Sequence, residues 1–377
     1  MMTEWRGHAA ALAADLVRAG ALTPDWRAAF EQVPRHLFVP RFFDDDGEIV
    51  SGDDRDGRGR WLAAVYSDVA LTTQIEDSPG TGPAWPTSSS TRPSLMARML
   101  DLLAIAGGER VLEIGTGTGY NAALLSHRLG ADRVTSVDVD SGLVDTARRR
   151  LAALKIFPHL YAEDGVHGSP GRAPYDRVIA TCGVSAIPAA WIRQLSLGGV
   201  IVADVRGGIS SSLVVARKTT GHAVTGRFTA EAGHFMWMRS HAMRDGGGTF
   251  DFDGPHTGTT GIPLADFGRD DFRFVLQLAI PDLAAIGGTV RDGRDGVFLV
   301  AGDRSWAEVG LPAGGRSAVA FGGPRAWWPD VADAWEWWNA RGRPGIARFG
   351  FTARDDGRRT FWVDEEDSQF PRTKSVV

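Results

Sequence analysis

The chain has almost no cysteine. Among its 377 residues, Cys182 is the single thiol, which excludes an internal disulfide and a thiolate metal cage and suits a reducing compartment. Its setting, "IATCGVS", is interpreted as that of a small buried residue. The nine histidines are scattered, with no H-E-x-x-H or comparable ligand spacing. No metal site is therefore predicted.

An excess of positive charge is also missing, as are long apolar runs. The 41 Lys and Arg residues against 46 Asp and Glu give a formal net charge of -5. The sequence has no run of basic residues of the kind that binds the phosphate backbone of a nucleic acid. No stretch of about 18 apolar residues is present, and the first 20 residues lack the continuous apolar core of a signal peptide. We expect a soluble cytoplasmic protein that binds neither nucleic acid nor membrane.

One segment near the N-terminus is rich in glycine and in charges of both signs. It reads "DDDGEIVSGDDRDGRGR", residues 44–60. Its carboxylates lack the spacing of an EF-hand calcium loop. We predict a solvated surface loop that follows two N-terminal helices, at about residues 6–19 and in "TPDWRAAFEQV".

From Leu95 to about Ser240 the sequence alternates between strand and helix patterns. Five apolar, β-rich runs are interpreted as buried strands: "RVLEIG" (110–115), "RVTSVDV" (133–139), "DRVIATC" (176–182), "GGVIVADV" (198–205) and "SSLVVARK" (211–218). The segments "YNAALLSHRLG" and "SGLVDTARRRLAAL" between them have helical spacing. Such alternation predicts a Rossmann-like α/β fold, with a mostly parallel sheet flanked by helices.

The alternation of strand and helix patterns ends at about residue 240. A glycine-rich stretch at 244–261 is interpreted as a linker, so we predict two domains, 1–244 and 245–377, the second a smaller α+β domain. In its helix, Val331, Trp335 and Trp338 share one stripe and are interpreted as core. Trp327 or Trp328 is the alternative candidate for lining a peptide groove, because Trp is enriched where binding energy concentrates.

A glycine-rich turn in "VLEIGTGTGYNAALL" predicts a nucleotide-binding loop. Glu113, Gly115, Gly117 and Gly119 lie on a strand-to-helix turn, where glycine lets the backbone approach a ligand. A dinucleotide fingerprint would read G-x-G-x-x-G, but Tyr120 follows Gly119 directly, so the third glycine is misplaced for that ligand.

The E-x-G-x-G-x-G form resembles the first motif of class I methyltransferases, which bind S-adenosylmethionine and release S-adenosylhomocysteine. The resemblance implies that Glu113 either accepts from the methionine ammonium or orients the loop. Asp138, at the end of the next strand, would accept from both ribose hydroxyls. Asp164, followed by Gly165 in "YAEDGV", would bind the adenine amine. The alternative for each acid is a structural cap.

Five side-chain hydroxyls, Thr87 to Thr91, precede this loop in "PTSSSTRPSLMARMLDLL". Helix capping is one interpretation, since Ser90 or Thr91 can accept from free backbone N–H groups with Pro93 in the first turn. Capping explains one hydroxyl, whereas the row contains five. We therefore favour a substrate role for Thr91.

The hydroxyl row, the glycine loop and the later pattern "YDRVIAT…IP…W…QL…GG" together resemble the protein-L-isoaspartate O-methyltransferases, from about residue 26 to 240. "VPRHLFVP" and "HFMWMRS" add to the resemblance. Aligned on Pro93, the family's Thr falls on Ser89, its Ile on Ser90 and its functional Ser on Thr91. The resemblance implies methylation of a carboxylate, which is already an anion at neutral pH and requires no general base. Thr91 is predicted to orient that carboxylate, assisted by Ser89 and Ser88.

The C-terminal half sharpens the functional prediction. Repair methyltransferases of this family are taken to be complete near the equivalent of residue 240, which makes residues 245–377 surplus. With its Trp-rich tail, the chain resembles extended relatives that modify ribosomally made peptides, such as lanthipeptides and ATP-grasp-crosslinked peptides. This implies a monomer that methylates an Asp side chain in a macrocyclic peptide, the ester then cyclising to aspartimide or isoaspartate. The alternatives are repair of isoaspartyl α-carboxylates in proteins and a non-catalytic peptide-binding module.

Overall fold

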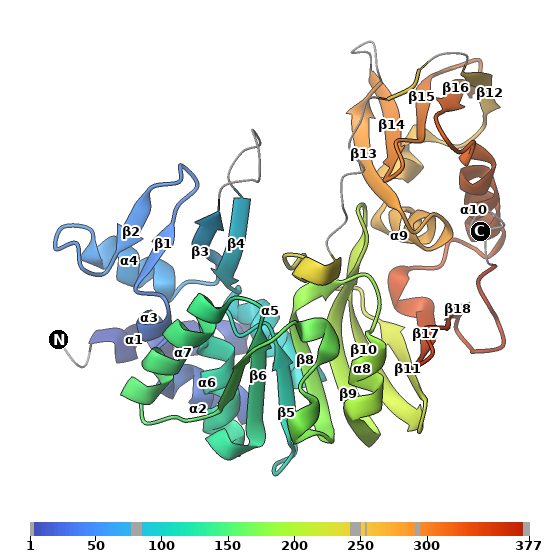
Figure 1. Ribbon diagram of the computed structural model, residues 1–377. Coiled ribbons are helices and arrows are strands. Elements are labelled where there is room, and N and C mark those ends of the chain that lie inside the picture. The colour runs from blue at the N-terminus through green and yellow to red at the C-terminus, as the bar shows by residue number, and fades with distance from the viewer. Residues whose placement is uncertain (1–3, 77–84, 242–249, 253–254, 291–294, 372–377) are drawn as a thin grey trace.

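The computed structural model describes residues 4–76, 85–241, 250–252, 255–290 and 295–371. They form three sheets with their helices (Figure 1). The nine-stranded sheet lies in the middle, with a small N-terminal sheet at one end and the C-terminal sheet at the other.

The N-terminal part combines four short helices with an antiparallel sheet of order β2-β1-β3-β4. Its elements are α1 (Glu4–Arg18), α2 (Pro24–Gln32), α3 (Arg35–Phe38), β1 (Arg41–Phe43), β2 (Ile49–Ser51), α4 (Arg58–Val65), β3 (Leu71–Glu76) and β4 (Trp85–Ser90). Both predicted helices are present, and α2 begins with Pro24 in its first turn. The predicted loop at 44–60 is wrong in part, because β2 and the start of α4 interrupt it. No cluster of potential metal ligands occurs among the described residues.

The central sheet has the order β18-β17-β11-β10-β9-β8-β5-β6-β7. Its strands and the helices beside them are α5 (Pro93–Leu102), β5 (Val111–Ile114), α6 (Tyr120–Leu129), β6 (Val134–Asp138), α7 (Ser141–Ala153), β7 (His159–Ala162), β8 (Tyr175–Val184), α8 (Ala189–Gln194), β9 (Leu195–Arg206), β10 (Ser211–Thr220), β11 (Ala223–Phe228), β17 (Phe349–Arg354) and β18 (Arg359–Val363). All five predicted strand runs fall on strands.

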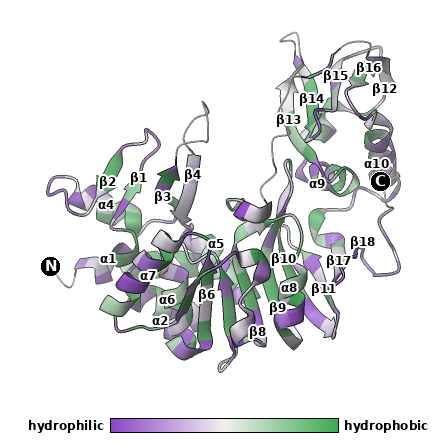
Figure 2. Ribbon diagram, in the orientation of Figure 1, coloured by the Kyte–Doolittle hydropathy of each residue, from purple (hydrophilic) through white to green (hydrophobic). Residues whose placement is uncertain are grey.

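The parallel part of this sheet consists of β7, β6, β5, β8 and β9. Every residue of β5 is buried, as expected for strands covered by helices on both faces, and Figure 2 shows these central strands as mostly hydrophobic. The run at 211–218 is antiparallel instead. The connection at 207–210 is too short for a parallel crossover, which needs a dozen or more residues.

The C-terminal unit is the third sheet, antiparallel and of order β12-β16-β15-β14-β13, with two helices packed on each other. Its elements are β12 (His256–Thr260), α9 (Asp270–Ala279), β13 (Leu283–Thr289), β14 (Asp295–Ala301), β15 (Trp306–Ala313), β16 (Arg316–Gly322) and α10 (Trp328–Ala340). Short 3-10 turns lie at Ala131–Arg133, Gly165–His167, Pro170–Arg172, Arg239–His241, Leu264–Gly268 and Ile346–Arg348. The predicted boundary at 244 lies outside the described residues. Beyond it, β17 and β18 return to the central sheet, where β17 pairs with β11.

Most tryptophans of this unit are core residues. Trp338 is fully buried and stacks on Phe272 at 5.2 Å between ring centroids. The Trp335 indole donates to an Asp266 carboxylate oxygen at 2.8 Å. Trp327 and Trp328 are exposed by only 2% and 7%, which favours a core role for both over the alternative that either lines a peptide groove. One hydrophobic cluster joins these side chains to the central strands β8 and β9.

None of the helices in the described ranges combines the length and the apolar character that crossing a membrane requires.

Candidate active site

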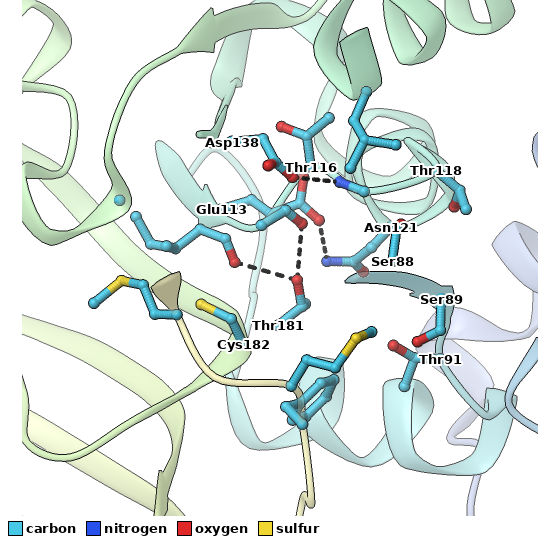
Figure 3. Close-up of a pocket in the computed structure, with 18 of the residues that line it drawn as sticks. Ser88, Ser89, Thr91, Glu113, Thr116, Thr118, Asn121, Asp138, Thr181 and Cys182 are labelled. Atoms are coloured by element: carbon cyan, nitrogen blue, oxygen red, sulfur yellow. Dashed lines mark hydrogen bonds between the residues drawn. The ribbon is translucent and has the colours of Figure 1, made fainter. Parts of the chain in front are cut away.

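A cavity of about 130 Å³ lies where β5, β6 and β8 end, facing β4 and the segment 235–239 (Figure 3). The carboxyl edge of parallel strands is where α/β folds bind ligands. The predicted site residues that line the cavity are Ser88, Ser89, Thr91, Glu113, Gly115, Gly117, Asp138, Asp164 and Gly165. Gly119 is the one predicted residue that does not line it.

Two of the loop glycines have different structural tasks. Gly115 has φ +96°, and a Cβ there would lie 2.7 Å from the Thr181 hydroxyl oxygen, which donates to the Gly115 carbonyl at 2.8 Å. Gly119 has φ +86°, and its Cβ would lie 2.9 Å from the Cβ of Ala147 in α7. Both conformations favour glycine. Gly115 therefore shapes the cavity, whereas Gly119 allows close packing of the loop against α7.

Glu113 is fully buried behind the loop. One carboxylate oxygen accepts from the Asn121 amide at 2.7 Å and the other from the Ser136 hydroxyl at 2.6 Å. Burial raises the pKa of Glu113 to about 7, against the lowering effect of these two donors. Because side chains engage both oxygens, the geometry favours the loop-orienting role among the two alternatives. Sequence reasoning missed both Asn121 and Ser136.

The raised pKa makes stability depend on pH. In the unfolded chain this carboxyl has an ordinary pKa of 4.5, so between that value and about 7 the folded state holds a proton that the unfolded state has lost. Stability from this group is therefore present at low pH and is lost as pH rises through 7. Relative to Glu113→Gln, the free energy of unfolding of the apo wild type should fall by about 2 to 3 kcal/mol between pH 5 and 8. Urea unfolding of both proteins across this range measures it, and a constant difference would contradict the assignment.

Two further acids close the cofactor side of the cavity. Asp138 accepts from the Gly117 and Asp140 N–H groups at 2.9 and 3.1 Å, one on each oxygen, and burial raises its pKa. Each carboxylate oxygen has two acceptor sites, so both retain capacity for a ribose hydroxyl. Asp164 accepts at one oxygen from the Val166 N–H and the Ser240 hydroxyl, both at 3.0 Å. Asp164 thus caps a short turn and also lines the cavity.

The cavity also contains a polar side chain that the described residues satisfy only in part. The Asn121 side-chain oxygen is buried and has no hydrogen-bond partner in the part of the chain that the structure describes. A buried polar atom without a partner is unfavourable. A ligand ammonium would satisfy it beside the Glu113 carboxylate, so these residues fit the methionine end of S-adenosylmethionine.

The hydroxyl row forms the opposite wall. Because side chains alternate along β4, Ser88 and Ser90 are buried, at 4% and 3% exposure, while Ser89 is half-buried on the other face. The Ser88 oxygen accepts from Thr73 at 3.2 Å. Within residues 4–76, 85–241 and the later described ranges, the Ser89 and Thr91 hydroxyls have no hydrogen-bond partner. Figure 3 shows the two hydroxyls turned toward one another at the cavity.

Helix capping does not explain the row. The N-cap of α5 is Arg92, and the Arg92 side chain makes no capping hydrogen bond. The Ser94 N–H is instead satisfied by an Asp68 carboxylate oxygen at 2.8 Å. The capping alternative for Ser90 and Thr91 is therefore wrong, and the Thr91 hydroxyl remains available to a ligand.

Arg35 supports this wall from behind and was not predicted. Its guanidinium is fully buried and hydrogen-bonds five carbonyl oxygens and one hydroxyl. These acceptors belong to Val65, Ser67, Val69, Ser90 and Thr91, with the Ser90 hydroxyl at 3.2 Å. No described carboxylate lies within ion-pair distance of it. Arg35 therefore fixes the junction of β4 and α5, and with it the position of Thr91.

The remaining wall comes from β8 and the segment 235–239. Cys182 is half-buried and lines the cavity, so the prediction of a small buried residue is only partly right. Burial raises the pKa of its thiol, which keeps it protonated and unsuited to nucleophilic attack. Gly183 pairs with Met236 and Met238 through two hydrogen bonds of 2.8 Å. This pairing places Trp237 in the lining of the cavity.

Comparison with known proteins agrees with this geometry. The model of the family protein-L-isoaspartate(D-aspartate) O-methyltransferase matches residues 58–235. A protein-L-isoaspartate O-methyltransferase of Azorhizobium caulinodans is 36% identical over 201 residues, which are 53% of this chain and 78% of the relative. One of Thermotoga maritima is 32% identical over 179 residues, 47% of this chain and 49% of the relative.

A solved structure titled protein-L-isoaspartate O-methyltransferase has a similar fold, with a TM-score of 0.54 at 21% identity. The match covers 94% of this chain and 99% of the other. It therefore includes most of the C-terminal unit. A C-terminal unit is therefore also part of the fold of that protein, whereas the prediction that residues 245–377 are surplus to simple repair stays a prediction.

Proposed function

Because this chain belongs to the protein-L-isoaspartate O-methyltransferase family and is an S-adenosylmethionine-dependent carboxyl methyltransferase, we propose that it methylates the α-carboxylate of isoaspartyl residues in peptides or proteins. The observation that carries this proposal is a pair of half-buried hydroxyls, Ser89 and Thr91, across from the glycine loop. Neither has a hydrogen-bond partner among the residues that the structure describes. An anionic oxygen at that wall faces the cofactor side of the cavity.

When bound, S-adenosylmethionine supplies a methyl group made electrophilic by its positively charged sulfur. Asn121 and Asp138 would hold the cofactor, and the methyl group that it would supply would be taken up by an anionic oxygen held at the Ser89 and Thr91 hydroxyls. No proton moves, because the carboxyl group is already ionised at neutral pH. The residues of the chain thus act by positioning, which can supply several kcal/mol of barrier reduction.

Neutral donors suit this task. The Ser89 and Thr91 hydroxyls can hold a carboxylate without adding a full positive charge beside the sulfonium. A hydrogen bond to a charged acceptor contributes about 1.5 to 3 kcal/mol. Arg35 keeps both hydroxyls in place through its bonds to Ser90 and Thr91. In this proposal the C-terminal unit contributes to recognition of the peptide.

A second candidate acceptor is an Asp side chain in a macrocyclic, ribosomally made peptide, the ester then cyclising to aspartimide or isoaspartate. It is favoured by Thr91, whose methyl group narrows the site relative to the serine of the resembled family and stiffens χ1. Ser90 also departs from that family's isoleucine, and its hydroxyl is taken up by Arg35.

Paired peptides separate the two candidates. Initial rates would be measured with an isoaspartyl peptide, the same peptide containing Asp, and a cyclic Asp peptide. The carboxylates of isoaspartate and Asp differ in position by one methylene, so we expect kcat/KM to favour the isoaspartyl peptide by about 10- to 200-fold. Turnover of the cyclic Asp peptide alone would replace the first candidate by the second. Absence of methyl transfer to all three would overturn both.

A further inference from the structure

A second cavity, of about 100 Å³, adjoins the active site. Trp237 lines both cavities, so the two adjoin at this residue. The second cavity lies beyond the carboxyl ends of β8 and β9, the same sheet edge that carries the active site. Its walls are largely apolar and include Phe228, Phe274, Leu278, Pro281 and Phe361.

The C-terminal unit builds one wall of this second cavity, through α9 and the residues that follow it. Gln277 of α9 accepts from the Ile209 N–H at 2.9 Å and donates to the Pro281 carbonyl at 2.9 Å. A Cβ at Gly207 would overlap the Gln277 side chain, so the turn after β9 lies directly against the helix. These contacts make the cavity a fixed feature of the fold.

The wall shared with the active site is also held in place. The backbone on both sides of Trp237 is hydrogen-bonded to Gly183. The Arg206 guanidinium lies 4.7 Å from the centroid of the Trp237 ring and donates to the Phe235 carbonyl. Arg359, at the other side of the cavity, donates to the Ser185 carbonyl at 3.1 Å. The two guanidinium groups disfavour a basic side chain in this cavity, while the aromatic walls favour an apolar one.

We propose that this cavity is a subsite for one large apolar side chain of the peptide substrate, of the leucine or phenylalanine class. The inference rests on the proposed function, because the peptide must place its carboxylate at Thr91. An extended chain advances about 3.3 to 3.6 Å per residue, and the two cavities adjoin at Trp237. The apolar residue would thus lie within about three positions of the methylated residue. The chain therefore prefers isoaspartyl sites in apolar sequence contexts.

A peptide series tests the subsite. Each peptide carries one isoaspartyl residue among alanines, with a single leucine moved through the three positions on either side, and a parallel set carries lysine. For wild type we expect one leucine position to lower KM about ten-fold relative to the all-alanine peptide, in the range that a pocket gives per apolar group. Lysine at that position should give no such gain.

Variants at Leu278 test whether the lower KM for the leucine peptide depends on this cavity. Leu278→Trp should fill it and abolish the leucine preference, without changing kcat for the all-alanine peptide or cofactor affinity. Leu278→Ala, which enlarges it, should weaken the preference and serves if the tryptophan variant does not fold. The matched control is Leu311→Trp, at a residue of β15 that is 61% exposed, which should keep the full preference.

The outcomes distinguish this inference from the proposed function. Equal KM for all peptides with wild type, or a preference unchanged in both Leu278 variants, would overturn the subsite while isoaspartyl methylation stands. No methylation of any isoaspartyl peptide by wild type would overturn the proposed function and the subsite together.

Discussion

Replacing Thr91 by valine is expected to lower kcat/KM for an isoaspartyl peptide by about 10- to 100-fold, the loss of one hydrogen bond to an anion. Valine keeps the shape of the side chain and removes only its donor. Since the Thr91 hydroxyl has no partner in the described structure, its removal should leave the fold unchanged. Affinity for S-adenosylmethionine, measured by calorimetry, should stay within about two-fold because the cofactor acids lie on the opposite wall.

Two further variants control this result. Thr91→Ser keeps the donor and should retain activity within a few-fold. Thr225→Val removes the hydroxyl of a half-buried threonine in β11, outside the cavity. The Thr225 hydroxyl oxygen lies 3.4 Å from the Thr352 hydroxyl oxygen. This variant should leave the rates unchanged. Full activity of Thr91→Val, or the same loss in Thr225→Val, would show that the Thr91 hydroxyl does not orient the acceptor.

Arg35→Met should destabilise the fold by about 3 to 5 kcal/mol, because several buried acceptors lose a donor and each unsatisfied one costs about 1 to 3 kcal/mol. The substitution removes the guanidinium N–H groups that donate to the carbonyl oxygens of Val65, Ser67 and Thr91. These buried and half-buried oxygens would lose this donor, and each group left unsatisfied is costly. Urea unfolding at fixed pH measures the change.

The control for this prediction is a surface arginine. Arg27 forms a 2.7 Å ion pair with Glu31 within α2, and its side chain is 52% exposed. Arg27→Met should change stability by less than about 1 kcal/mol, since exposed pairs contribute little. Comparable losses in the two variants would mean that the Arg35 network does not hold the wall.

Features encoded by nearby residues could be predicted from the sequence. The fold class is confirmed, because the alternation of apolar runs with helical segments is a local pattern. The glycine loop with Asp138 and Asp164 at the cavity follows from the same logic, since acids that end parallel strands meet at one edge. The roles assigned to these side chains in catalysis and cofactor binding stay predictions.

Features that depend on distant residues could not be predicted. Arg35 and Ser90 are 55 positions apart, and nothing near "VPRHLFVP" indicates which carbonyls its guanidinium meets. The cap of α5 comes from Asp68, 26 positions before Ser94. Likewise β17 joins the central sheet through β11, although more than a hundred residues separate them. In each case the partner is set by tertiary packing and cannot be read from the neighbouring residues.

The most direct test of the hydroxyl wall is a crystal structure of the protein with S-adenosylhomocysteine and an isoaspartyl peptide. The account predicts a carboxylate oxygen of the peptide at hydrogen-bond distance, about 2.5 to 3.0 Å, from the Thr91 hydroxyl, on the side that faces the cofactor sulfur. A carboxylate bound elsewhere, with the Ser89 and Thr91 hydroxyls facing solvent, would contradict it.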